Sequence, residues 1–130
     1  MVDDEFITAF QRGELEPFHH CDHVRMAFLY LLRHPALEAM RLFSDDLARF
    51  AASKGKPDRY HETITWALLL LIRERMARNG FENWDDFSAR NPDLLDWKDT
   101  LSRYYRAETL GSELARRVFV FPDRLATLSG

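Results

Sequence analysis

Residues 64–72 read ITWALLLLI, and this stretch decides the fold class. It is apolar on almost every side, yet its unbroken apolar run, 66–72, is far short of the roughly 20 residues that span a bilayer. Asp58 is a good N-cap ahead of it, and Gly80 is a suitable stop behind it. We therefore predict a helix that starts just after Asp58 and ends at Asn79. A helix this apolar must be covered by other elements, so it should be the central and most buried one.

Proline and glycine residues divide the rest of the chain into further helical segments. Most of these segments carry apolar residues three and four positions apart, and no alternating strand pattern of useful length appears except at 118–121, which we expect to be an extended tail. The fold class predicted is an all-α, single-domain helical bundle over 1–130, with three or four core helices plus short peripheral helices. The additional helices are expected at 3–11, 17–34 and 36–54, after Asn83, after the start signal Asn91-Pro92-Asp93, and from Ser112 to Arg117.

Composition and charge narrow the classes of protein to consider. The chain has 130 residues, of which 46% are hydrophobic and 30% charged, as in ordinary globular proteins. Its formal net charge is −3, whereas nucleic-acid binders need a basic face, so we expect no nucleic-acid partner. The apolar run at 66–72 is too short to span a bilayer, so we expect no membrane partner either. Cys21 is the only cysteine and the acidic N-terminus lacks an apolar leader segment. A cytoplasmic location is therefore predicted.

Two polar clusters stand out, FHHCDH at 18–23 and YHETIT at 60–65. His20 and His23 are three residues apart, so on a helix they share a face. Short connections make consecutive helices antiparallel, which would make the helices at 17–34 and after Asp58 parallel to each other. Both clusters lie at the starts of these helices. We therefore expect them at the same end of the bundle, facing one pocket.

This arrangement suggests a metal site. A divalent ion needs three or four nitrogen, oxygen or sulfur ligands. His20, His23 and either His61 or Glu62 could supply three, and an open position would remain for water or substrate. We take His20, His23 and His61 as the metal ligands and Glu62 as the catalytic base. The pattern does not distinguish Zn, Fe, Mn and Ni. The residues predicted to bind the substrate are Tyr60, Thr63 and Arg116.

Two other interpretations stay open. Two helix N-termini aimed at one pocket provide partial positive charge, which favours a carboxylate or phosphate over a cation. A metal-free His/Glu pocket is therefore a direct rival. Alternatively, the histidines only cap their helix, and Glu62 only complements the dipole of its own helix.

The same residues resemble a motif pattern of small bacterial all-helical proteins. The resemblance covers most of the chain, from Phe18 to Asp123, and it implies that His19 and Cys21 are incidental members of the first cluster. It implies no particular reaction. The matching residues are Phe18, His20 and His23, then Tyr60 through Thr65, and in the tail Ala115-Arg116, Phe119-Val120 and Pro122-Asp123.

The function predicted from these features is that of a small intracellular enzyme with a His/Glu pocket. It would act on a small, anionic molecule by hydrolytic or acid–base chemistry, with a divalent metal as the possible cofactor. The alternative is a non-enzymatic helical protein that binds a small ligand or a partner. The oligomeric state does not follow from the sequence.

Overall fold

The computed structural model describes residues 2–124, and every regular element in that range is helical. The all-α fold class is therefore confirmed. No helix among the described residues combines the length and apolarity needed to cross a membrane. The α-helices are α1 (Asp3–Gln11), α2 (His20–Arg33), α3 (Ala36–Ser53), α4 (Glu62–Asn79), α5 (Trp84–Arg90), α6 (Trp97–Ser102), α7 (Ala107–Leu110) and α8 (Glu113–Arg117), with 3₁₀ turns η1 (Pro57–Arg59) and η2 (Pro92–Leu95).

The chain forms two compact units, Met1–Tyr60 and His61–Gly130. The first contains α1 to α3 and η1, and the second contains α4 to α8 and η2. One domain spanning 1–130 stays a prediction. Each unit is described by itself below.

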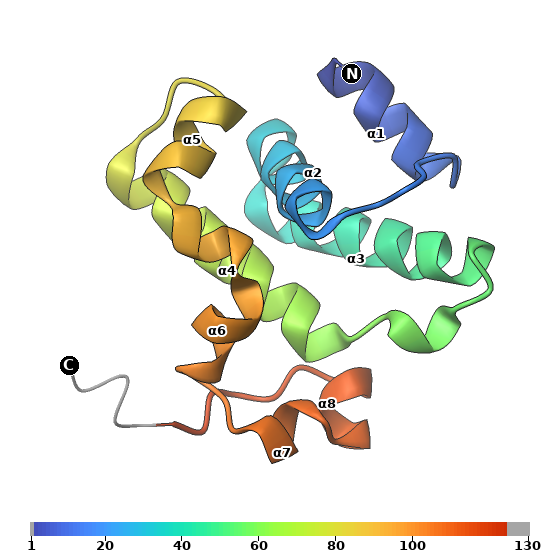
Figure 1. Cartoon of the computed structure of the whole chain (residues 1–130), viewed down its shortest axis with the longest axis vertical. Coiled ribbons are helices and arrows are strands. Elements are labelled where there is room, and N and C mark those ends of the chain that lie inside the picture. The colour runs from blue at the N-terminus through green and yellow to red at the C-terminus, as the bar shows by residue number, and fades with distance from the viewer. Residues whose placement is uncertain (1, 125–130) are drawn as a thin grey trace. The chain divides into compact units, whose positions relative to one another are not determined.

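The first unit is built around an aromatic cluster. In Figure 1, α2 and α3 lie side by side and α1 packs against both. Phe10 of α1 is buried, with its ring centroid 5.2 Å from that of Phe50 and 6.0 Å from that of Phe43, both on α3. Tyr30 of α2 meets the same Phe43 ring edge-on at 5.4 Å. Apolar residues at helical spacing thus meet as the periodicity predicts.

The second unit is organised on α4, the 18-residue helix that contains the stretch ITWALLLLI. Helices α6 and α8 pack on it (Figure 1). Ala67 of α4 forms a buried cluster with Leu101 and Tyr105. The segment 118–121 belongs to no helix or strand, and Val118 has an extended backbone. The extended conformation of the other residues of this segment stays a prediction. The sequence predicts that this helix is apolar on almost every side and the most buried one. Leu68, Leu69 and Ile72 are indeed buried, whereas Leu70 is 44% exposed.

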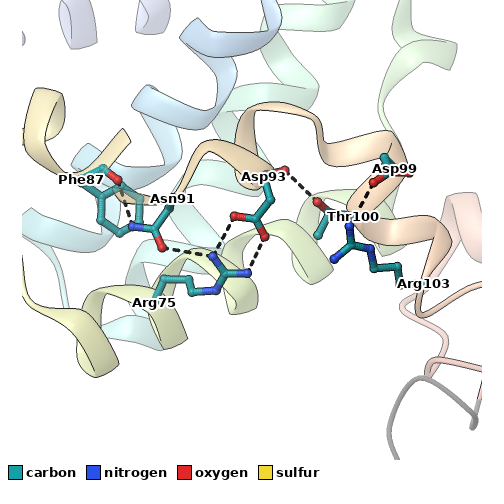
Figure 2. A network of polar contacts seen from close by, with 7 residues as sticks. All are labelled: Arg75, Phe87, Asn91, Asp93, Asp99, Thr100 and Arg103. Atoms are coloured by element: carbon teal, nitrogen blue, oxygen red, sulfur yellow. Dashed lines mark hydrogen bonds and ion pairs between the residues drawn. The ribbon is translucent and has the colours of Figure 1, made fainter. Parts of the chain in front are cut away.

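A polar network fastens α4 to the helices that follow it (Figure 2). The Arg75 guanidinium donates two hydrogen bonds to the Asp93 carboxylate, at 2.6 and 2.9 Å, and a third to the side-chain oxygen of Asn91 at 3.1 Å. Asn91 in turn donates to the carbonyl of Phe87 at 2.9 Å, and Thr100 donates to that of Asp93 at 2.7 Å. The Arg75 guanidinium also holds the pKa of Asp93 below its usual value. Arg75 therefore joins α4 to η2 and to Asn91, where α5 ends, and Thr100 joins α6 to η2.

The starts of α2 and α4 differ from the sequence prediction. Pro17 was expected in the first turn, but α2 begins at His20, and His19 is its N-cap with an extended backbone. Asp58 was expected to cap α4, but it lies in η1, and His61 is the cap. In both helices the first residue is determined by a hydrogen bond between a side chain and a backbone N–H three residues away. This bond can form only once the first turn is helical. The accepting side chains are Asp22 in α2 and His61 in α4.

The segment after Asn91 also differs. The signal Asn91-Pro92-Asp93 predicts an α-helix, whereas the structure has the short 3₁₀ turn η2 there and starts α6 only at Trp97. Asp93 is held by Arg75, and its carbonyl accepts from Thr100. These contacts from outside the turn fix its geometry. The caps predicted for α5 and α8 are correct, because Asn83 accepts from Asp86 N and Ser112 accepts from Ala115 N.

Candidate functional site

The first polar cluster lies at the start of α2 in the first unit. His20 and His23 fall in and just after the first turn, and their ring centroids are 6.2 Å apart, as spacing of three predicts. The Asp22 carboxylate turns back and accepts the backbone N–H of His19 at 3.0 Å. A carboxylate at this position also complements the positive end of the helix dipole. Cys21, between the two histidines, is exposed.

The His23 imidazole lies among aromatic rings. Its centroid is 5.8 Å from that of Phe18 and 5.7 Å from that of Phe43. The side chain as a whole is half-buried, but its Nε2 atom is shielded from solvent and has no hydrogen-bond partner among the described residues. Burial, and secondarily the charge that His20 could carry, lowers the pKa of His23 to about 4. His23 is therefore neutral at pH 7.

This lowered pKa makes the first unit sensitive to acid. In the unfolded protein His23 binds a proton below about pH 6.5, whereas in the folded protein it binds one only below about pH 4. The contribution of His23 to the unfolding free energy should therefore be fully present above pH 6.5 and be lost as the pH falls toward 4. The loss should be about 2 to 3 kcal/mol, because one pKa unit corresponds to about 1.4 kcal/mol. NMR titration of the imidazole measures the pKa directly, and a value near 6.5 would contradict this prediction. In His23→Phe the fall in stability between pH 6.5 and 4 should shrink.

His61 opens the second cluster, and its imidazole has a structural part in the second unit. Nδ1 accepts the backbone N–H of Ile64 at 3.1 Å, which caps α4. Nε2 lies 2.7 Å from the carbonyl oxygen of Leu110, so this nitrogen carries the proton and donates it. Metal binding by His61 would break one of these two hydrogen bonds. That His61 is a metal ligand stays a prediction.

We expect His61→Ala to lower the unfolding free energy of the second unit by about 1 to 3 kcal/mol. The variant removes a helix cap, worth about 1 kcal/mol, and leaves the Leu110 carbonyl without this donor. His61→Asn should recover part of the loss, because asparagine caps helices well but is too short to reach Leu110. Urea unfolding followed by tryptophan fluorescence compares the two variants. Equal losses would show that the cap contributes nothing.

The remaining residues predicted for the site are one structural side chain, Thr63, and the less buried Tyr60, Glu62 and Arg116. The hydroxyl of Thr63 is fully buried, donates to the Val118 carbonyl at 2.8 Å and accepts the N–H of Val120 at 3.1 Å. It therefore holds the tail segment at Val118 and Val120 against α4. Glu62 is half-buried in the first turn of α4, and Arg116 is exposed on α8. Substrate binding by Tyr60, Thr63 and Arg116 and catalysis by Glu62 stay predictions.

The two clusters fall in different units. His20, His23 and Tyr60 belong to the first unit, whereas His61, Glu62, Thr63 and Arg116 belong to the second. Their meeting in one pocket therefore stays a prediction. Within residues 2–124, no group of three or more His, Cys, Asp or Glu side chains is arranged to hold a metal ion.

Sequence reasoning missed a buried polar cluster in the first unit. The Tyr30 hydroxyl donates to the Asp46 carboxylate at 2.5 Å and accepts from the Gln11 amide at 3.3 Å, and Arg49 forms an ion pair with the same carboxylate. Burial and the Asp46 hydrogen bond raise the pKa of Tyr30. The available signal was the position of Asp46 three residues after Phe43, on the buried face of α3. These contacts connect side chains of α1, α2 and α3 within the first unit.

Comparisons with protein-family models, with curated proteins and with solved structures found no significant match to this chain. The resemblance to small bacterial helical proteins therefore stays a prediction. Any function assigned to the chain must rest on the chemistry of its own residues.

Proposed function

We propose that this chain is a small enzyme that binds a small molecule at His20 and His23 and acts on it by hydrolytic or acid–base chemistry. The observation that carries the proposal is the Nε2 atom of His23, which is buried, has no hydrogen-bond partner among the described residues, and belongs to a neutral imidazole. Buried polar atoms in native proteins almost always have partners, and one left without a partner costs about 1 to 3 kcal/mol. A ligand that reaches this nitrogen would remove that cost.

A neutral imidazole suits the proposed chemistry. Depending on its tautomer, Nε2 can accept a proton or donate one, and histidine is the commonest general acid or base in enzymes. The neighbouring His20 ring provides a second imidazole on the same face of α2. An anionic substrate remains the expectation from the sequence. The absence of any possible internal disulfide supports a reducing, cytoplasmic setting.

Hydrolysis of p-nitrophenyl acetate and p-nitrophenyl phosphate, with a chelator present, tests the proposal. We expect His23→Phe to lower the rate about 10²- to 10⁴-fold, the usual contribution of general acid–base catalysis. Phenylalanine keeps an aromatic ring beside Phe18 and Phe43, so the variant should stay folded. His34→Ala is the matched control, because His34 caps the other end of α2. Equal rates in wild type and His23→Phe would contradict the proposal.

A binding protein without catalysis is the second candidate. It is favoured by the second cluster, because the polar side-chain atoms of His61 and Thr63 are used in hydrogen bonds inside the second unit. These hydrogen bonds would have to change before either side chain could exchange a proton with a substrate. Probe-induced shifts of the His23 imidazole resonances without any product would favour this candidate over the enzyme.

A further inference from the structure

Helix α4 ends in the pair Asn79-Gly80, which is a chemically reactive sequence. The backbone nitrogen of the residue after an asparagine can attack the side-chain carbonyl carbon, Cγ, and close a five-membered succinimide ring. Glycine in the second position favours this attack, because it has no side chain to hinder the approach and adopts a wide range of backbone angles. Of the three asparagines in the chain, only Asn79 is followed by glycine.

The structure leaves this pair open to the reaction. Both residues are exposed, where the chain leaves α4 on its way to α5 (Figure 1). Asn79 is the last residue of the helix, where helices fray, and Gly80 has already left helical geometry with a φ of 66°. Within residues 2–124 the side-chain amide of Asn79 has no hydrogen-bond partner. A Cβ atom placed on Gly80 would meet nothing within 4 Å, so neighbouring groups do not block ring closure.

The other two asparagines are protected by their contacts and by the residues that follow them. Asn83 is followed by a tryptophan, and its side-chain oxygen accepts the N–H of Asp86 at 2.9 Å. Asn91 is 1% exposed, and its side-chain oxygen accepts from Arg75. The next residue is Pro92, whose nitrogen carries no proton to lose on ring closure. The chain therefore contains its own controls for a reaction at Asn79.

We propose that Asn79 is a site of spontaneous modification, at which the asparagine is converted to aspartate or isoaspartate through a succinimide formed with Gly80. In the first step the Gly80 nitrogen loses its proton to solvent and forms a bond to Cγ of Asn79. The side-chain nitrogen takes up a proton and leaves as ammonia. In the second step water adds to one of the two ring carbonyls and opens the ring. Opening at one carbonyl gives aspartate, and opening at the other gives isoaspartate, so water is the only co-reactant.

The conversion changes both charge and backbone at the end of α4. It replaces a neutral amide by a carboxylate, which adds one negative charge to the formal net charge of −3. A carboxylate at the C-terminus of a helix lies at the negative end of the dipole, which is unfavourable. Isoaspartate also adds a methylene group to the backbone between α4 and α5. Arg75, which binds Asp93, lies about one helical turn before this position (Figure 2). The inference does not depend on the proposed function.

Timed incubation of the full chain at mildly alkaline pH and body temperature tests the inference. Isoelectric focusing follows the added charge, and peptide mass mapping locates the exchange of an amide NH₂ for OH. We expect an acidic form to accumulate, with two products at Asn79 and no change at Asn83 or Asn91. A synthetic peptide of residues 75–82 provides the reference rate, and we expect the folded protein to react at a comparable rate.

Asn79→Gln is the matched variant, because it keeps the amide and the charge but would have to close a six-membered ring, which forms more slowly. The acidic form should be lost in this variant. Three results would overturn the inference: no conversion at Asn79 during a time in which the peptide reacts, equal conversion at all three asparagines, or an undiminished acidic form in Asn79→Gln. The first of these would show that the end of α4 protects the pair.

Discussion

We expect Arg75→Ala to lower the unfolding free energy of the second unit by about 2 to 4 kcal/mol. The variant removes three charge-assisted hydrogen bonds at once, two to Asp93 and one to Asn91. Asn91 is buried, so its side-chain oxygen loses this donor in a place where water reaches it poorly. Removing one partner of a fully buried ion pair costs about 3 to 5 kcal/mol, and we expect somewhat less here because both side chains are partly exposed.

Tryptophan fluorescence measures the unfolding of the second unit, which contains Arg75. Trp66, Trp84 and Trp97 are the three tryptophans of the chain, and all belong to the second unit. The matched control is Arg78→Ala, one turn further along α4, where the arginine makes only an exposed pair with Glu74. Such pairs contribute about 0.3 to 0.5 kcal/mol on a helix. Equal effects of the two substitutions in urea unfolding would show that the network in Figure 2 adds nothing beyond a surface ion pair.

The same network predicts a pH dependence with a defined sign. Arg75 lowers the pKa of Asp93 in the folded protein, so the unfolded state binds a proton more readily at acid pH. This part of the stability is present above the unfolded pKa, about 3.9, and is lost as the pH falls through the folded value. In Arg75→Ala the acid loss should become smaller. An unchanged acid profile would contradict the assignment of this pKa shift to Arg75.

The positions of the longer helices could be predicted because the signals are local. In α3, Met40, Phe43, Leu47 and Phe50 repeat at intervals of three and four, and the observed helix is Ala36–Ser53. Asn83 and Ser112 are good caps in sequence, and each accepts a backbone N–H three residues ahead. These features depend on residues within one or two turns. They therefore do not require knowledge of the tertiary structure.

The role of His61 could not be predicted in this way. Histidine is not among the preferred N-caps, so Asp58 was the better choice from sequence. The imidazole of His61 is held from both sides, and its second partner, the carbonyl of Leu110, lies 49 residues away. Thr63 is similar, since its partners Val118 and Val120 lie 55 and 57 residues away. Contacts of this range leave no local pattern in the sequence.

In the candidate site, too, the features that depend on local sequence could be predicted, and those that depend on distant contacts could not. The shared face of His20 and His23 follows from their spacing, and the structure places their rings near each other. The burial of the Nε2 atom of His23 does not follow from spacing, because Phe43 on α3 contributes to it. The lowered pKa of His23, about 4, is a consequence of that packing. Local sequence therefore identified the pair, and the tertiary contacts determined which chemistry is available to it.

The largest effect on stability in the first unit should come from Phe10→Ala, which we expect to lower its unfolding free energy by about 3 to 5 kcal/mol. Phe10 is 1% exposed and its ring meets those of Phe18, Phe43 and Phe50 at centroid distances of 5.2 to 6.0 Å. Alanine at this position leaves a cavity between α1 and α3. The surrounding rings are fixed by each other and can fill that cavity only in part.

Phe10→Leu separates the loss of volume from the loss of the ring. Leucine refills most of the cavity, so the remaining loss of about 1 to 2 kcal/mol would measure the aromatic contacts and the residual cavity. Leu37→Ala is the control for an apolar residue outside the core, because Leu37 is 83% exposed, and its effect should stay within about 0.5 kcal/mol. Amide hydrogen exchange in α2 and α3 reads out the first unit without relying on tryptophan. If Phe10→Ala and Leu37→Ala changed protection equally, the aromatic cluster would not be the core of this unit.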